Sequence, residues 1–152
     1  MKPTNEMKLE FVSRSTNEGF ARVAVASFIA SLDPTLDELN EVKTAVSEAV
    51  TNAIVHGYKD KLGIVYIQTK IFPNGNIMIT VKDKGCGIEN IDKAMEPMYT
   101  SSDSGDRAGM GFTIMQAFMD KVKVISNKDG TKVIMQKRLS LRVSTAKQAM
   151  FE

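Results

Sequence analysis

Several residue types that carry common enzyme chemistry are scarce in this chain. It contains one cysteine, Cys86, one histidine, His56, and no tryptophan. A single cysteine excludes an internal disulfide and a zinc site of clustered cysteines, and a single histidine leaves no second imidazole for a metal centre. Hydrolase chemistry with a histidine-activated nucleophile would depend on His56 alone. That residue precedes Gly57 at the expected end of a helix, where helix capping is the simpler role.

Long apolar runs are also missing. The sequence has no stretch of eighteen apolar residues and no basic segment followed by an apolar one at its start, so we expect neither a membrane span nor a secretory signal. These absences predict a cytoplasmic protein. The length of 152 residues and the apolar content of 43% are those of one domain with an ordinary core. We expect a single domain over residues 1–152, with a flexible tail from about 141 to 152.

The formal charge of +2 is unevenly distributed along the chain. Residues 1–120 hold 12 Lys and Arg against 16 Asp and Glu, whereas residues 121–152 hold 8 against 2. The basic C-terminal part either protects an exposed sheet edge or offers a docking surface to an acidic partner. Nucleic-acid binding is not favoured, because the basic residues have almost no interleaved aromatic residues.

Residue periodicity and turn signals predict an α+β domain. The pattern of strand, two helices, hairpin, polar segment, helix and hairpin indicates a two-layer α/β sandwich, with a mixed sheet and helices on one face. In the helix expected before Asp33-Pro34, the inward residues are expected to be Phe20, Val23, Ala24 and Phe28. Strands are expected at 7–11, 63–72, 77–82, 122–126 and 132–139, and helices at about 16–32, 36–57, 89–99 and 112–119.

Capping boxes and turn residues mark the expected boundaries of these elements. Ser15 to Glu18 and Thr35 to Glu38 both have capping-box spacing, so each is expected to begin a helix. Gly57 is the natural end of the second of these helices. The segment 73–76, Pro-Asn-Gly-Asn, predicts a tight hairpin turn.

The long helix carries the first candidate functional residues. Glu48 and Asn52 are four residues apart, so they share one helix face with Cβ atoms about 5–6 Å apart. One can accept a proton while the other holds a metal ion; alternatively, both are merely solvated. Periodicity places them away from the apolar stripe of the helix, which consists of Leu39, Val42, Val46, Ala49, Val50 and Ala53.

Asp83 ends a strand whose alternate residues are apolar. If that face is buried, the carboxylate points into an apolar interior and needs a donor, and the amino group of an adenine is such a donor. Alternatively, Asp83 only caps the turn at Gly85. Gly85 and Gly87 would allow the backbone to approach a base closely, and Ile88 would line the wall of the pocket.

A small, polar and unpatterned segment follows at 100–107, with the composition of a mobile lid. Gly109-Met110-Gly111 then leads into an apolar helix, whose first backbone N–H groups would be free for phosphate oxygens. Arg107 would be available to a terminal phosphate. A Gly-x-Gly before a helix is also often only a turn.

Two familiar kinase and ATPase signatures are absent. The chain has no G-x-x-x-x-G-K-[ST] phosphate loop and no H-R-D or D-F-G segment, which excludes a P-loop enzyme and an ordinary protein kinase. It does contain, in order, Glu-x-x-x-Asn at 48–52, Asp-x-Gly-x-Gly at 83–87 and Gly-x-Gly at 109–111. These boxes resemble those of the GHKL superfamily, which includes DNA gyrase, sensor histidine kinases and MutL and has the Bergerat ATP-binding fold.

A closer resemblance covers roughly residues 5–140. The run from Phe20 to Leu39, continued by 46–58, resembles the anti-sigma F factors of spore-forming bacteria. This resemblance implies a homodimer that binds a sporulation sigma factor, sigma F, and phosphorylates a serine of an anti-anti-sigma factor. It implies ATP and Mg²⁺ as cofactors and a partner contact at Arg22.

The resemblance also implies residue roles. Glu48 would be the catalytic base, Asn52 the metal ligand, and Asp83 the partner of the exocyclic amine of ATP. Residue patterns and resemblance together predict a nucleotide-binding set of Thr51, Asn52, Asp83, Gly85, Gly87, Ile88, Thr100, Arg107, Gly109, Met110, Gly111 and Thr113.

Three other functions use the same boxes. An ATP-gated binding module without kinase activity would need Asp83 and the glycines but not Glu48. A detached histidine-kinase catalytic domain would lack its acceptor histidine, since His56 is in the wrong element. An ATPase of the gyrase or MutL kind normally needs a large transducer domain, which 152 residues cannot supply.

Overall fold

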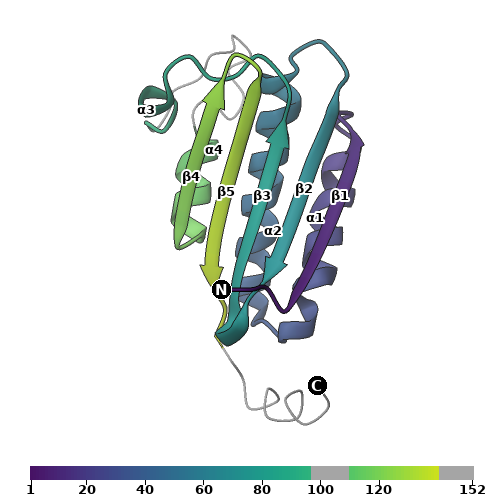
Figure 1. Ribbon diagram of the computed structural model, residues 1–152, viewed down its shortest axis with the longest axis vertical. Coiled ribbons are helices and arrows are strands. Elements are labelled where there is room, and N and C mark those ends of the chain that lie inside the picture. Colours follow the sequence, from purple (N-terminus) through teal and green to yellow (C-terminus); the bar gives the residue numbers. More distant parts are fainter. Residues whose placement is uncertain (97–109, 141–152) are drawn as a thin grey trace.

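One layer of the fold is a five-stranded sheet with the order β1-β2-β3-β5-β4 (Figure 1). Its strands are β1 (Asn5–Val12), β2 (Ile64–Ile71), β3 (Asn76–Asp83), β4 (Lys121–Asn127) and β5 (Gly130–Arg138). All neighbouring strands are antiparallel, so the prediction of a mixed sheet is wrong. The reason is the last hairpin, which places β5 between β3 and β4. These two strands run in the same direction but never pair.

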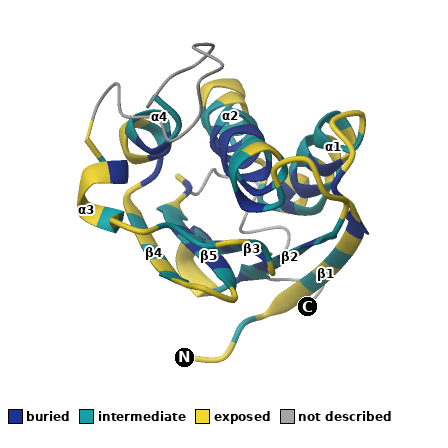
Figure 2. Ribbon diagram, turned by 90° about the horizontal axis from the view of Figure 1, so that it is seen from above, coloured by how far each residue is buried: buried dark blue, intermediate teal, exposed yellow. Residues whose placement is uncertain are grey.

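The second layer consists of helices on one face of this sheet (Figure 2). They are α1 (Asn17–Ile29), α2 (Leu36–Asn52), α4 (Gly111–Phe118) and, at the side, the short α3 (Ile91–Ala94). Helix α2 lies between α1 and α4. A 3-10 turn, Ala30–Leu32, extends α1, and a π-helical turn, Ala53–Gly57, extends α2. The predicted two-layer α+β sandwich is therefore confirmed.

The computed structural model describes residues 1–96 and 110–140. The predicted lid at 100–107, Pro97 as a helix end and the predicted tail from 141 lie outside these residues. Within them, no helix is both long and apolar enough to cross a bilayer.

The core forms where the alternating strands meet the apolar stripe of α2. Ile67, Ile79 and Met135 point inward from three neighbouring strands and are almost fully buried, as are Val46 and Val50 of α2. Each such side chain contributes about 1.5–3 kcal/mol by leaving water. The stripe predicted for α2 and the inward parity predicted for β3 are thus both confirmed.

The inward face of α1 differs from the predicted one. Ala21, Val25 and Ile29, each four residues apart, are fully buried, whereas Phe20 and Val23 are 53% and 57% exposed. A row of i, i+4 residues forms the ridge that packs against a neighbouring helix, and here the small Ala21 belongs to that row. Phe20 lies beside it and stacks edge-on against Phe11, with ring centroids 6.5 Å apart.

Only one of the two predicted capping boxes forms. Thr35 Oγ1 accepts the Glu38 N–H at 3.1 Å, and the Thr35 N–H donates to Glu38 Oε1 at 2.9 Å. At α1 the N-cap is Thr16, whose side chain makes no capping hydrogen bond. Asn17 Nδ2 instead donates to the Val12 carbonyl at 2.8 Å, which ties the start of α1 to the end of β1.

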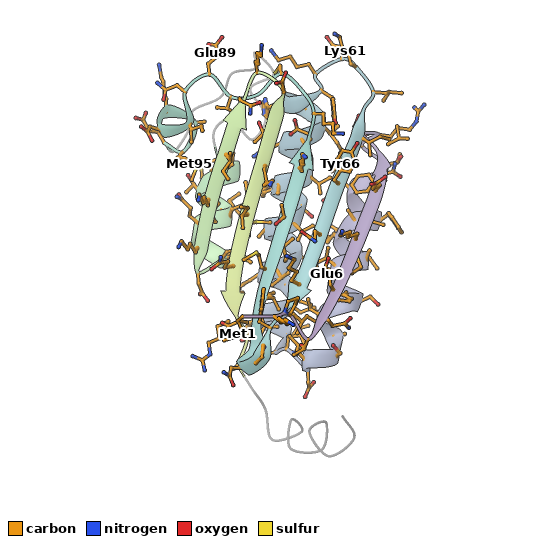
Figure 3. All side chains as sticks on the ribbon, viewed as in Figure 1. Met1, Glu6, Lys61, Tyr66, Glu89 and Met95 are labelled. Atoms are coloured by element: carbon orange, nitrogen blue, oxygen red, sulfur yellow. The ribbon has the colours of Figure 1, made fainter. Side chains whose placement is uncertain are left out.

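The sheet face away from the helices is polar. Glu6 and Tyr66 lie on it, as Figure 3 shows. The strand register places Lys82 directly opposite Lys132, and Lys123 opposite Ile134, on the same face. Part of the basic charge of the C-terminal sequence is therefore spread over the open face of β4 and β5.

We expect Thr35→Ala to lower the free energy of unfolding by about 1 kcal/mol, because a backbone N–H of the first turn of α2 loses its acceptor. Urea denaturation followed by circular dichroism measures this change. Ser15→Ala is the matched control and should change the free energy by less than about 0.5 kcal/mol. Equal losses in the two variants would contradict the assignment of the cap.

Candidate functional site

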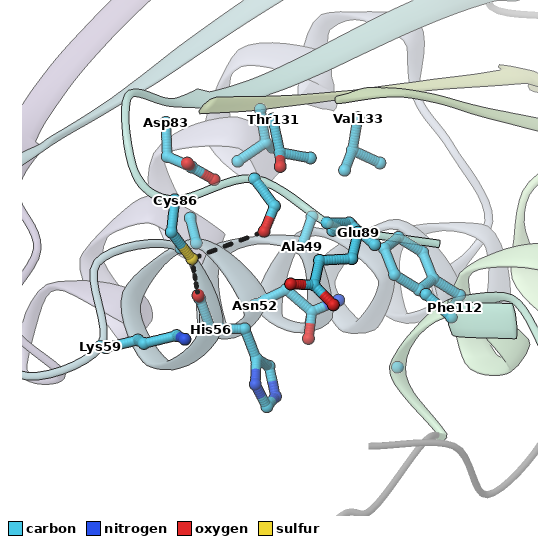
Figure 4. A pocket seen from close by; sticks show the side chains of 17 residues that line it. Ala49, Asn52, His56, Lys59, Asp83, Cys86, Glu89, Phe112, Thr131 and Val133 are labelled. Carbon is cyan, nitrogen blue, oxygen red and sulfur yellow. Dashed lines mark hydrogen bonds between the residues drawn. The ribbon is translucent and has the colours of Figure 1, made fainter. Parts of the chain in front are cut away.

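A cavity of about 350 Å³ opens between the ends of β3 and α2 and the start of α4 (Figure 4). We call it the β3–α2 cavity. Its volume lies within the usual range of small-molecule sites. Its lining residues are Ala49, Asn52, Ala53, His56, Gly57, Lys59, Val81, Asp83, Cys86, Gly87, Ile88, Glu89, Ala94, Gly111, Phe112, Thr131 and Val133.

The carboxylate of Asp83 lies at the inner wall of this cavity, and the residue is only 4% exposed. Its Oδ1 accepts the Gly85 N–H at 2.9 Å. Burial raises the pKa of Asp83, while hydrogen bonds from the backbones of Gly85 and Thr131 act in the opposite direction. The turn-capping role and the inward orientation predicted for Asp83 therefore coexist, and the carboxylate can still accept from a ligand.

Gly57 allows the end of α2 to approach this carboxylate. A Cβ at Gly57 would lie 2.8 Å from Asp83 Cγ, which is closer than side chains tolerate. The Gly57 carbonyl also accepts the Cys86 N–H at 2.9 Å. The glycine that was predicted only to end the helix thus also joins α2 to the loop after β3.

Gly87 has a similar role at the opposite wall. Its φ is +77°, and a Cβ there would lie 1.8 Å from the Asn127 carbonyl oxygen in the β4–β5 hairpin. The loop after β3 therefore lies directly against that hairpin. Ile88 follows and lines the cavity, as predicted. Gly85 supports Asp83 through its N–H.

Thr131 is a cavity residue that was missed by the sequence reasoning. It is buried and pairs directly with Asp83 across β3 and β5. The signal was present in the sequence, because Thr131 has the same parity as the apolar Val133 and Met135. A polar side chain on the inward face of a strand next to Asp83 points to the same pocket.

His56 was also missed as a cavity residue. His56 and Lys59 both line the cavity, and the His56 carbonyl accepts the Cys86 S–H at 3.3 Å. Burial and, second, the charge of Lys59 lower the pKa of His56. Both effects favour the neutral form of the imidazole.

Glu48 and Asn52 lie at the boundary between two hollows. Asn52 lines the β3–α2 cavity, and a Cβ at Gly111 would lie 3.1 Å from its Nδ2 and 3.5 Å from Glu48 Oε2. Glu48 is only 4% exposed, so its expected position on a polar, uncovered face is wrong. The reason is that α1 and α4 pack on either side of α2.

The second hollow, of about 390 Å³, lies between α1 and α2, and we call it the α1–α2 groove. Ser47 is buried there, and its Oγ and the Nε of Arg22 have no hydrogen-bond partner within the described residues. Arg22 Nη1 lies 3.8 Å from Glu18 Oε1. The groove is lined by Ser15, Glu18, Arg22, Thr44, Ser47, Glu48, Thr51, Ile54 and Val55. Thr51, predicted to contact nucleotide, thus lies on this side.

The start of α4 closes the other side of the cavity. Met110 is its N-cap, and Gly111 and Phe112 line the cavity. The hydroxyl oxygen of Thr113, in the first turn, is buried without a partner in the described part of the chain. The predicted residues Thr100, Arg107 and Gly109 lie outside the described residues.

A dedicated metal cage is not found in residues 1–96 and 110–140, where no three His, Cys, Asp or Glu side chains gather. Asn52 is the amide at the cavity wall. Mg²⁺ keeps several waters and binds through few protein ligands together with phosphate oxygens, so a single amide oxygen fits this ion when a phosphorylated ligand is present.

We expect the buried charge of Asp83 to give a characteristic pH dependence. Because its folded-state pKa is raised, the folded state binds the proton more tightly, and stability falls as pH rises from near 3.8 through the folded pKa. The unfolding free energy of the ligand-free protein, relative to Asp83→Asn, should therefore be higher at pH 4 than at pH 7. Denaturant titrations over this range measure it. A pH-independent difference would contradict the raised pKa.

Comparisons with known proteins identify the family of this chain. A family model described as the histidine kinase-like ATPase domain matches residues 11–137. An anti-sigma F factor of Clostridium kluyveri is 58% identical over 88% of this chain and 94% of its own. An anti-sigma F factor of Clostridium perfringens is 56% identical over 90% of this chain and 98% of its own.

Solved structures share the fold at low sequence identity. The RsbU and RsbW domains of a Mycobacterium tuberculosis protein match with a TM-score of 0.66 at 18% identity, over 92% of this chain and 34% of that one. A blue-light activated histidine kinase of Erythrobacter litoralis matches with a TM-score of 0.57 at 24% identity, over 80% of this chain and 42% of that one. The family model and the curated relatives place the chain in the histidine kinase-like ATPase family, as a member of its anti-sigma F factor group.

Proposed function

We propose that this protein is an ATP-dependent protein serine kinase and an anti-sigma factor, which binds sporulation sigma F and phosphorylates a serine of the anti-anti-sigma factor. One observation carries the kinase part: Glu48 lines an open groove that suits an acceptor, and it lies one helical turn from Asn52 and close to Gly111, which line a cavity that suits a nucleotide. The identity of the partners is supported by the close anti-sigma F relatives.

ATP fits the β3–α2 cavity by the chemistry of its walls. The buried Asp83 carboxylate would accept a hydrogen bond from the adenine amino group, which is worth roughly 1.5–3 kcal/mol when one partner is charged. Ile88 and Val133 offer apolar surface to the base. The triphosphate would then extend toward the start of α4, where free backbone N–H groups attract anions.

Mg²⁺ would be held by Asn52 together with phosphate oxygens and water. The ion, when bound, neutralises charge on the phosphates. The orphan hydroxyl of Thr113 at the first turn of α4 supports this placement of the phosphates, because a buried hydroxyl without a partner can donate to an anionic oxygen. Thr100, Arg107 and Gly109 remain predicted phosphate contacts.

Transfer would begin with an acceptor serine in the α1–α2 groove. Glu48 would accept the proton of the serine hydroxyl, while the serine oxygen bonds to the γ-phosphorus and the bond from that phosphorus to the ADP oxygen breaks. A positioned base of this kind typically contributes 10²–10⁴-fold to the rate. Arg22 and Ser47, with donors that lack partners within the described residues, would bind carbonyl or carboxylate groups of the protein substrate.

The remaining parts of the proposal are supported by family membership. The chain would act in the cytoplasm as a homodimer, without direct contact to nucleic acid or membrane. Sedimentation at micromolar concentration tests the dimer, and we expect a mass of twice 16.7 kDa.

A second candidate is an ATP-gated binding module without kinase activity. It is less favoured because such a module does not need a carboxylate at position 48.

We expect Glu48→Gln to abolish transfer of labelled phosphate from ATP to the anti-anti-sigma factor, because the acceptor hydroxyl loses its base, and to leave ATP affinity within about threefold. Calorimetry measures the affinity, and phosphoamino-acid analysis identifies the product. Glu41→Gln, on the same helix but bound to Lys137 at 3.1 Å, is the matched control and should retain transfer. Unchanged transfer in Glu48→Gln would contradict the role of Glu48 as the base, whereas ATP binding without any transfer in the parent protein would leave only the binding module.

We expect Arg22→Glu to weaken binding of the anti-anti-sigma factor at least tenfold, because the reversed charge removes the guanidinium donors of the α1–α2 groove, a loss of about 1.4 kcal/mol or more. The affinity for ATP should stay unchanged, since Arg22 lies outside the β3–α2 cavity. Lys43→Glu, a charge reversal elsewhere on the helical layer, is the control. A parallel loss of ATP affinity in Arg22→Glu would argue against two separate sites.

A further inference from the structure

Ser126 lies behind the wall of the β3–α2 cavity and joins two residues that line it. The strand register places it directly opposite Thr131, and the two hydroxyl oxygens are 2.7 Å apart. Ser126 Oγ also accepts the Ile88 N–H at 2.7 Å. Ser126 is absent from the residues that line the cavity, so any effect it has on a ligand must pass through Thr131 and Ile88.

We propose that Ser126 is a positioning residue for the base of the bound nucleotide. It orients the Thr131 hydroxyl toward the base and fixes the Ile88 backbone at the cavity wall. This inference rests on the proposed nucleotide site and adds to it a residue that never touches the ligand.

Counting protons at the two hydroxyls shows how Ser126 would act. Each hydroxyl has one proton and two lone pairs, and one lone pair of Ser126 is occupied by the Ile88 N–H. Its proton can go to Thr131 Oγ1 at 2.7 Å or to the Gly130 carbonyl at 3.3 Å. If Ser126 donates to Thr131 Oγ1, the shorter of the two contacts, the proton of the Thr131 hydroxyl stays free for a ligand in the cavity.

The wall then presents an acceptor and a donor side by side. Asp83 and Thr131 are direct partners across β3 and β5, and both line the cavity. An amino group next to an unprotonated ring nitrogen complements this pair, because the amine donates to the carboxylate and the ring nitrogen accepts from the hydroxyl. The 6-aminopurine edge of adenine has this pattern, whereas a 6-oxopurine reverses both groups.

The contact to Ile88 fixes the loop that carries the second wall. Gly87 already lies against the Asn127 carbonyl, and the hydrogen bond from Ile88 to Ser126 is the next anchor along the chain. Without the Ser126 hydroxyl, the Ile88 N–H loses its acceptor at a partly buried position, and the wall can shift away from the base.

The test is a double-mutant cycle on ATP affinity, measured by calorimetry with Mg-ATP on the full chain. We expect Ser126→Ala to weaken ATP binding about tenfold, the effect of one lost hydrogen bond of ordinary strength, with kcat at saturating ATP within twofold. Ser126→Thr, which keeps the hydroxyl, should bind within about threefold of the parent. In a Thr131→Val background, Ser126→Ala should weaken ATP binding by a clearly smaller factor than it does in the parent protein.

Asn127→Ala is the matched control for the hairpin itself. Asn127 Oδ1 accepts the Asp129 N–H at 2.8 Å, so this variant weakens the turn and leaves the two hydroxyls in place, and ATP affinity should stay within threefold. Equal losses in Asn127→Ala and Ser126→Ala, or an undiminished effect in the Thr131→Val background, would overturn the inference. Absence of saturable ATP binding in the parent protein would instead overturn the proposed function.

Discussion

The carboxylate of Asp83, held in an apolar interior, is the constraint on which the rest of the site depends. Burying a carboxylate is costly unless donors surround it, and here the donors come from the loop at Gly85 and from Thr131 on the neighbouring strand. Gly57 makes room for the carboxylate at the end of α2. The sheet, the long helix and the glycine loop thus converge on one charged group that still has accepting capacity for a ligand.

Helix α2 separates binding from chemistry. On one side of α2, Asn52 lines the β3–α2 cavity. On the other side, Ser47 and Thr51 line the α1–α2 groove. Glu48 lies between these sides, close to the start of α4. A carboxylate in this position can serve an acceptor from the groove without taking part in holding the base, which is the separation that our proposal needs.

Much of this arrangement could be predicted from the sequence. Alternation located the strands and the inward direction of Asp83, and the Thr35 capping box located the start of α2. The failures have physical causes that a single sequence does not reveal. Burial of Glu48 depends on α1 and α4 flanking α2, the exposure of Phe20 depends on close packing at Ala21, and the antiparallel sheet depends on where the last hairpin inserts. Thr131 was missed although its parity on β5 marked it as inward.

The most direct test of this account is calorimetric titration of the protein and of Asp83→Ala with ATP in the presence of Mg²⁺. The account predicts one saturable site per chain in the parent and an affinity at least tenfold weaker in the variant, since a hydrogen bond to a charged group is lost. Equal affinities in the two proteins would contradict it, because the nucleotide would then be bound without the carboxylate around which the site is built.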